Sequence, residues 1–315
     1  MEKQRKVMIA ILTMLVLIGV IAVIDVSLRI DKTAGPEIKL KMPQFGPGIA
    51  IVRVDGPIEM TGPSGFSGVP KGAESVIKRL DELGKNSDIR GIVLRINSPG
   101  GTVAATQEIY EKLWKLRKKN IILTASMGDV AASGGYYIAS ACNHIVANYG
   151  TVTGSIGVIA YSPNLKKLFD KLGIGMNVIK SGKYKDILAS HRDLAPEERK
   201  LLQEMIDSSY DKFIKDIARG RNMNESEIIP VADGRIMNGE TALRHGLIDQ
   251  TGTFEDAILK AKELAGLKED APVYDDILSP FDSVLGILGN YFSGGSLSFD
   301  KLLGPGKAVE YRYQQ

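Results

Sequence analysis

The chain has few of the residues that build metal sites, disulfide frameworks or histidine-based catalytic sites. It contains one cysteine, Cys142, and three histidines in 315 residues. A single cysteine excludes an intramolecular disulfide, so the fold must depend on a hydrophobic core. The apolar surroundings of Cys142 predict a small, buried side chain. No HExxH motif and no cluster of cysteines and histidines occurs, so we expect neither a metal nor another cofactor.

A large excess of charge of one sign is also missing. The 40 lysines and arginines face 37 aspartates and glutamates, which leaves a formal net charge of +3. The densest basic run, residues 115–119, ends a predicted helix, where cations complement the helix dipole. We therefore expect no nucleic acid partner.

Charged residues are absent from residues 7–24. At about 1.5 Å per residue this run is near the lower limit for crossing a hydrocarbon core of about 30 Å. The run is not followed by a cleavage site of the A-x-A type, which favours an uncleaved transmembrane anchor over a cleaved signal peptide. Basic residues precede the run, so we expect residues 1–6 in the cytoplasm and the folded part outside it. Residues 25–48 contain several glycines and prolines and are typical of a tether.

Strands and helices alternate over residues 49–266, which predicts one α/β domain. We expect strands at residues 49–54, 91–96, 121–125, 144–147, 155–160 and 176–180, and helices at 73–83, 102–118, 134–141, 164–172 and 196–219. This β-β-α order of elements suits stacked sheets, although a doubly wound sheet gives a similar pattern.

The tail, residues 267–315, carries an apolar stripe at helical spacing. Such a stripe is typical of a contact with another subunit or with the membrane surface; a poorly ordered tail is the alternative.

One serine lies among small residues where a predicted strand meets a predicted helix. Ser133 belongs to the run Ala132-Ser-Gly-Gly-Tyr-Tyr137. At such a junction it lies near unpaired backbone N–H groups and the positive end of the helix dipole. These groups suit an oxyanion that forms when a serine attacks a carbonyl carbon. The alternative is a helix N-cap without chemistry.

A second glycine turn, Asn97-Ser-Pro-Gly-Gly101, follows the predicted strand at 91–96. Two successive strand–turn–helix units offer two sets of free amides at the same edge of a sheet. An oxyanion hole needs two convergent donors, but alone the pair also suits an ordinary packing turn in an α/β protein.

A serine nucleophile needs a base, and the histidines are poorly placed for that role. His144 begins an apolar strand, His191 lies in a charged loop and His245 lies at a helix end. A lysine replaces histidine when burial lowers its pKa from about 10.4 towards neutrality. The run Ser181-Gly-Lys-Tyr-Lys-Asp186 offers Lys183 and Lys185, and spacing does not separate them.

Four motifs resemble the short form of signal peptide peptidase A in order and rough spacing. They are the two glycine turns, the lysine run and Thr153-Gly-Ser-Ile-Gly-Val158. The resemblance covers roughly residues 49–266 and implies a ClpP/crotonase-like fold, with Ser133 as nucleophile and Lys185 as general base. It also implies that Ser155 supports the lysine and that Gly134 and Gly101 form the oxyanion hole. Short relatives are ring- or dome-like oligomers, so we expect a homo-oligomer.

The resemblance implies a serine endopeptidase that degrades remnant signal peptides, or other extended apolar peptides, at the membrane. Three alternatives stay open. The first is a peptidase of the same fold that cleaves a stomatin-like membrane partner. The second is a crotonase-type acyl-CoA enzyme, and the third is an inactive membrane scaffold.

Overall fold

The computed structural model describes residues 46–61, 72–275 and 310–312. The expected anchor at residues 7–24, most of the tether and the apolar stripe of the tail lie outside the described residues. Among the residues that are described, no helix combines the length and the apolar character needed to cross a bilayer.

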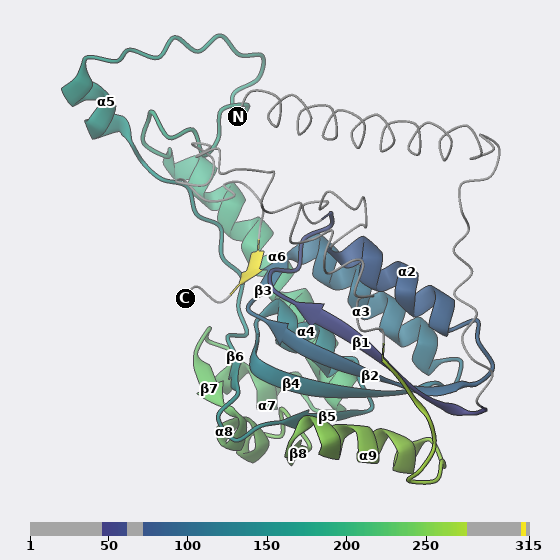
Figure 1. The fold of residues 1–315 in the computed structure, drawn as a ribbon. Helices are drawn as coiled ribbons and strands as arrows, with labels where there is room; N and C mark the ends of the chain where they lie inside the picture. Colours follow the sequence, from purple (N-terminus) through teal and green to yellow (C-terminus); the bar gives the residue numbers. More distant parts are fainter. Residues whose placement is uncertain (1–45, 62–71, 276–309, 313–315) are drawn as a thin grey trace, which may run out of the picture. The chain divides into compact units, whose positions relative to one another are not determined.

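A mainly parallel sheet forms the centre of the fold (Figure 1). Its strand order is β7-β6-β4-β2-β1-β9, and β5 and β8 join through β4. The long central strands are β1 (Gly48–Asp55), β2 (Ile89–Ser98) and β4 (Ile122–Ala132). Their apolar side chains are buried, which confirms three predicted strands; β4 extends further than predicted, up to the residue before Ser133.

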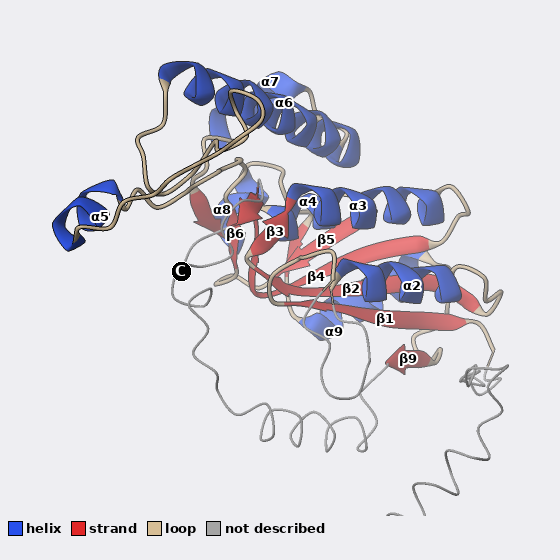
Figure 2. Ribbon diagram, turned by 90° about the horizontal axis from the view of Figure 1, so that it is seen from above, coloured by secondary structure: helices blue, strands red, loops and turns tan. Residues whose placement is uncertain are grey.

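Helices cover both faces of the sheet (Figure 2). One face carries α2 (Ala73–Leu83), α3 (Val103–Arg117) and α4 (Gly134–Ser140), in the positions predicted from the sequence. The other face carries α9 (Phe254–Leu264). There Ala257 and Ala261 pack on Ile49, Ile51 and Val93. These two buried layers make up the core that a chain without disulfides requires.

Short elements complete the sheet. β5 (His144–Ala147) was predicted; β6 (Val152–Gly154), β7 (Ile236–Asn238) and β8 (Gln250–Thr251) follow along the chain. β9 (Val273–Asp275) pairs in parallel with β1, so the sheet continues past residue 266. Short helical elements also occur: α7 (Glu225–Ile228), a 3₁₀ turn (Ile229–Val231) and α8 (Gly239–Arg244).

Two strand predictions were wrong. The strand expected at residues 155–160 lies earlier, at β6, where it pairs with the end of β4. Residues 176–180 form no strand: their side chains are exposed, and the described part of the chain offers them no neighbouring strand to pair with.

The segment around residues 176–180 connects two helices. α5 (Lys166–Leu172) has no buried residue, whereas α6 (Pro196–Arg221) buries Phe213, Ile214 and Ile217. We call residues 157–193 the arm, because most of its side chains are exposed and α5 is drawn apart from the sheet (Figure 1).

A second, two-stranded sheet includes the two glycines of the turn at residues 97–101. β3 (Gly100–Thr102) pairs antiparallel with β10 (Glu310–Arg312), with Tyr311 opposite Gly101. The C-terminal part of the chain therefore supplies a strand next to the predicted oxyanion hole.

Candidate active site

Ser133 connects β4 to α4 in a backbone conformation that disfavours a side chain. Its φ is 53° and its ψ is −116°. A residue with a Cβ in such a region costs about 1–3 kcal/mol and usually occurs at a functional site. The serine hydroxyl forms no capping hydrogen bond to α4, so an ordinary N-cap does not explain it. A strained serine between a strand and a helix is the arrangement of a nucleophile elbow.

The pairing of β6 with β4 places Ser155 next to Ser133. Ala132 is paired with Gly154 at the ends of these parallel strands, and the Ser133 N–H donates to the Gly154 carbonyl over 2.8 Å. Neighbouring strands lie about 4.8 Å apart, so the two serines that follow are neighbours. Ser155 also has a positive φ, 50°, and its N–H donates to Arg235 O over 2.7 Å.

The two glycine turns approach so closely that a side chain has no room. A Cβ on Gly134 would lie 3.1 Å from Gly101 N, and a Cβ on Gly101 would lie 1.9 Å from Ile58 O. Glycine at position 134 allows the start of α4 to approach β3, and glycine at position 101 allows the backbone of Ile58 to approach β3. The structure thus places Ser133, Gly134, Gly101 and Ser155 close together.

The Gly101 amide points to the edge of β3 that Ile58 does not use. Ile58 N–H donates to Gly100 O, and Thr102 N–H donates to Ile58 O, both over 2.9 Å. Because alternate residues of a strand bond to opposite sides, Gly101 presents its N–H and C=O to the other edge. β10 is paired with that edge and also approaches α4.

Two tyrosines anchor the helix that begins after Ser133. The Tyr136 hydroxyl donates to Leu247 O over 2.8 Å, and the Tyr137 hydroxyl donates to the Asp216 carboxylate on α6. Both rings are fully buried, and burial raises the pKa of Tyr136 far above its usual value. These phenols are therefore structural anchors that fix the position of α4 and hence of Ser133.

Lys185 lies in the arm, in a run of turns at residues 183–188, and its side chain is exposed. Within the described residues, no hydrogen bond joins it to Ser133, whereas Ser133 is 1% exposed. Lys183 lies over the ring of Tyr184, with its Nζ 5.1 Å from the ring centroid. The structure of one chain therefore assembles the nucleophile side of the site without the predicted base.

The histidines lie in the elements predicted for them. His144 begins β5 and is paired with Thr124, eight residues before Ala132 on β4. At roughly 3.3 Å per residue, about 30 Å of strand separates its partner Thr124 from Ser133. His191 lies in the turn before Arg192, and His245 lies at the end of α8. Across the ranges described, no three acidic, cysteine or histidine side chains cluster as a metal site would need.

Three features of this region were missed by the sequence reasoning. Ile58, which pairs with β3, lies in a segment rich in glycine and proline without a strand pattern. β10 had a signal: Val309, Tyr311 and Tyr313 alternate with charged residues. The third feature, the ion pairs of Arg192 beside the lysine run, joins residues whose contact no local pattern reveals.

Comparison with known proteins gives consistent similarities. The profile of peptidase family S49 matches residues 115–268, and that of Clp protease matches residues 69–146. A candidate protease of Synechocystis sp. is 48% identical over 223 residues, which cover 71% of this chain and 78% of that protein. A candidate signal peptide peptidase of Enterococcus faecium is 37% identical over 216 residues, 68% of this chain and 63% of that protein. The chloroplastic serine protease SPPA of Arabidopsis thaliana is 38% identical over 221 residues, 70% of this chain but only 32% of that protein.

Proposed function

We infer the reaction of this chain from one premise: it belongs to peptidase family S49 and is a serine peptidase. We propose that it is a membrane-anchored endopeptidase that degrades signal peptides through a Ser133–Lys185 dyad. The observation that carries the proposal is the strained backbone of Ser133 beside the amides of Gly134 and Gly101.

In the proposed reaction, Lys185 removes the Ser133 proton while Oγ attacks the carbonyl carbon of a peptide bond. The resulting oxyanion accepts hydrogen bonds from the N–H groups of Gly134 and Gly101. Lys185 then gives its proton to the leaving amine, and an acyl-enzyme remains on Ser133. The same lysine activates the water that releases the acyl product. Ser155, the neighbour of Ser133 across the β4–β6 pair, accepts or donates a hydrogen bond that holds the amine near the nucleophile.

A second copy of the chain supplies the lysine in this proposal. Lys185 is exposed in one chain, and the arm around it exposes large apolar side chains that normally need a partner. These side chains are Leu168, Leu172, Ile174, Met176, Val178 and Ile179. Burial of this arm against a neighbouring copy removes apolar surface from water and desolvates Lys185, which favours its neutral form. The similarity to Clp protease agrees with an oligomer, since such proteins commonly assemble.

The edge of β3 that β10 occupies supports the proposed substrate class. That edge already accepts an extended strand of this chain, β10, in antiparallel pairing. An extended peptide that binds in the same way places its backbone beside the oxyanion amides and presents alternate side chains to the two sides of the strand. Signal peptides are extended apolar substrates of this kind, and the relative in Enterococcus faecium is named for them. The uncharged run at residues 7–24 supports an anchor that keeps the peptidase at the membrane, outside the cytoplasm.

The first test compares wild type with Ser133→Ala and Lys185→Ala on unfolded casein and on a synthetic signal peptide. We expect both variants to lose activity by several orders of magnitude and Lys183→Ala to keep it. Cleavage by Lys185→Ala at the wild-type rate would exclude the dyad.

The second test determines whether the dyad forms between copies. Ser133→Ala and Lys185→Ala chains are unfolded together in equal amounts, refolded and assayed. If a site combines residues of two chains, random assembly restores about a quarter of the wild-type activity, since half of the chains supply each intact residue. If both residues belong to one chain, the mixture stays inactive.

A further inference from the structure

The segment that carries Lys185 has little backbone structure of its own. Lys185 N–H donates to Gly182 O over 3.4 Å, and Ile187 N–H donates to Tyr184 O over 3.1 Å. Neither bond belongs to a helix or a strand. A general base displaced by about 1 Å can lose as much as 100-fold in rate. A lysine on such a segment therefore needs an anchor outside the turn itself.

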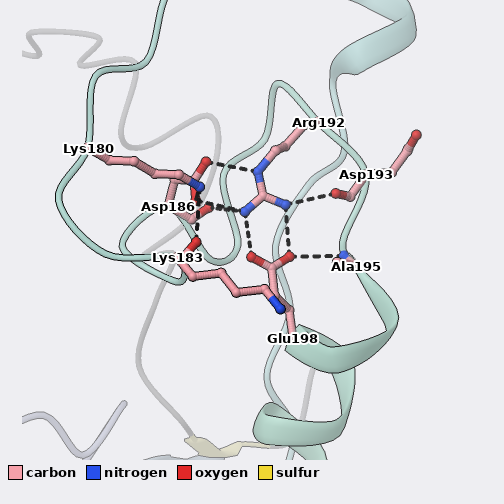
Figure 3. Close-up of polar contacts among 7 residues, drawn as sticks. All are labelled: Lys180, Lys183, Asp186, Arg192, Asp193, Ala195 and Glu198. Carbon is pink, nitrogen blue, oxygen red and sulfur yellow. Dashed lines mark hydrogen bonds and ion pairs between the residues drawn. The ribbon is translucent and has the colours of Figure 1, made fainter.

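Arg192 provides a contact from this segment to a rigid element (Figure 3). Its guanidinium bonds to the carboxylate of Asp186, the residue after Lys185, through Nε at 3.0 Å and Nη2 at 2.9 Å. It also bonds to the carboxylate of Glu198 through Nη1 at 2.8 Å and Nη2 at 2.6 Å. Nη1 donates in addition to Asp193 O over 3.0 Å. One planar group thus holds two carboxylates, each in a bidentate contact.

Glu198 connects this contact to α6. It lies in the first turn of the helix, accepts a hydrogen bond from Ala195 N–H over 2.9 Å, and has a side chain that is 4% exposed. Further along, α6 is held by its buried residues Phe213, Ile214 and Ile217. The chain of contacts therefore runs from the core through Glu198 and Arg192 to Asp186, which is bonded covalently to Lys185.

Lys180 makes a second set of contacts with the segment that carries Lys185. Its Nζ lies 2.5 Å from Asp186 Oδ1 and 3.0 Å from Lys183 O (Figure 3). The two cations, Lys180 and Arg192, balance the two anions, Asp186 and Glu198. Arg192 holds the pKa of Asp186 far below its usual range and lowers that of Glu198 to about 2. Both carboxylates therefore stay ionised near neutral pH. The contact that Arg192 makes with them keeps its charges in the pH range in which a lysine base must work.

We propose that Arg192 is a positioning residue of this peptidase: by bonding to Asp186 and Glu198 together, it fixes Lys185 relative to α6. This proposal rests on the proposed role of Lys185 as general base. Lysine is no substitute for arginine here, because an ammonium is a point charge without the planar fork that binds two carboxylates. The arginine acts through geometry and touches neither the substrate nor the reacting atoms.

The decisive variant is Arg192→Lys, which keeps the charge and removes the fork. We expect kcat to fall about 10- to 100-fold with KM within about twofold of wild type, because the proposed substrate-binding edge is β3 and not the lysine segment. Labelling of Ser133 by a fluorophosphonate probe reports activation of the nucleophile without a peptide substrate. Its rate should fall in parallel with kcat.

The matched control is Arg221→Lys. Arg221 bonds bidentately to Asp249 at 2.8 and 2.7 Å, but it joins the end of α6 to the residue before β8 rather than to the lysine segment. This variant should lose thermal stability and keep the kcat and the labelling rate of wild type. Equal losses of kcat in the two variants would overturn the proposal, since the cause would then be general destabilisation.

The remaining outcomes are also decisive. Wild-type kcat in Arg192→Lys, with Lys185→Ala inactive, overturns the positioning role and leaves the dyad intact. An active Lys185→Ala removes the premise and overturns both. If Arg192→Lys does not fold, the Asp186→Asn variant tests the same proposal. It weakens the contact between Arg192 and the lysine segment but leaves the Arg192–Glu198 pair at the start of α6 intact. We expect the same fall in kcat from it, and an unchanged kcat overturns the proposal.

Discussion

Replacement of Ser133 by glycine should stabilise the protein while it abolishes activity. The backbone of Ser133, with φ 53° and ψ −116°, lies in a region that glycine adopts readily and other residues do not. The appropriate reference is Ser133→Ala, which removes the same hydroxyl and retains the Cβ. The comparison therefore isolates the cost of the backbone conformation from the chemistry.

The size of the effect follows from two opposing contributions. Relief of the unfavourable conformation contributes about 1–3 kcal/mol. The greater freedom of glycine in the unfolded chain opposes this by roughly 0.4–1 kcal/mol. The net gain is about 1 kcal/mol, which raises the Tm of a domain of this size by about 2–4 °C. Both variants should be inactive in the casein assay.

Thermal unfolding followed by circular dichroism, at one protein concentration, measures the difference. Ser208→Gly is the control, because Ser208 is an exposed residue inside α6 with ordinary helical geometry. Glycine there should lower stability by roughly 0.5 kcal/mol. If Ser133→Gly is no more stable than Ser133→Ala, the backbone of Ser133 is not strained and the nucleophile-elbow argument fails.

Three other perturbations test separate parts of the site. Gly134→Ala places a Cβ 2.9 Å from Thr106 Oγ1 and 3.1 Å from Gly101 N, so relief of these contacts must move the two oxyanion N–H groups apart, and we expect kcat to fall about 100- to 1000-fold. Gly150→Ala, whose Cβ meets nothing within 4 Å and which lies outside the arm, should keep wild-type kcat; equal kcat in the two variants would contradict this. Tyr311→Pro should raise kcat/KM for a peptide substrate, because proline disrupts the β10 pairing that occupies the β3 edge; an unchanged value would mean that β10 does not compete. The pKa of Glu198 is lowered to about 2, from about 4.3 in an unfolded chain, so its contribution is complete above the higher value and is lost as pH falls towards the lower one. The Tm of Glu198→Gln should therefore fall less than that of wild type between about pH 5 and pH 2, and equal falls would refute the pairing.

The parts of the fold that the sequence predicts well are those with a local signal. The buried strands β1, β2 and β4 are continuous apolar runs, and α2 and α3 follow them with helical spacing. The glycines around Ser133 also carry a local signal, because close approach of two backbones excludes any side chain. Both glycine turns were therefore found before their contact was known.

Short strands carry at most a weak local signal, such as the alternation of apolar and charged residues around β10. β6, β9 and β10 contain three residues each, and partners far away in the sequence decide whether they form. The neighbour of Gly101, Tyr311, lies more than two hundred residues later in the chain. No periodicity in three residues identifies such a partner, so these pairings emerge only from the tertiary structure.

In the arm the sequence prediction fails for the opposite reason. A local strand pattern is present, but within the described residues no neighbouring strand pairs with it. Residues 176–179 are mainly apolar and predict a strand, yet they are exposed and irregular in the single chain. A strand needs a neighbour that supplies hydrogen bonds, and apolar side chains need a surface that excludes water. The predicted base, Lys185, lies in the same arm and has the same deficiency: it lacks the buried surroundings that a neutral amine requires. One event, burial of the arm against a second copy, would supply the missing surroundings for both, which is why assembly and completion of the site are best tested together by mixing inactive chains.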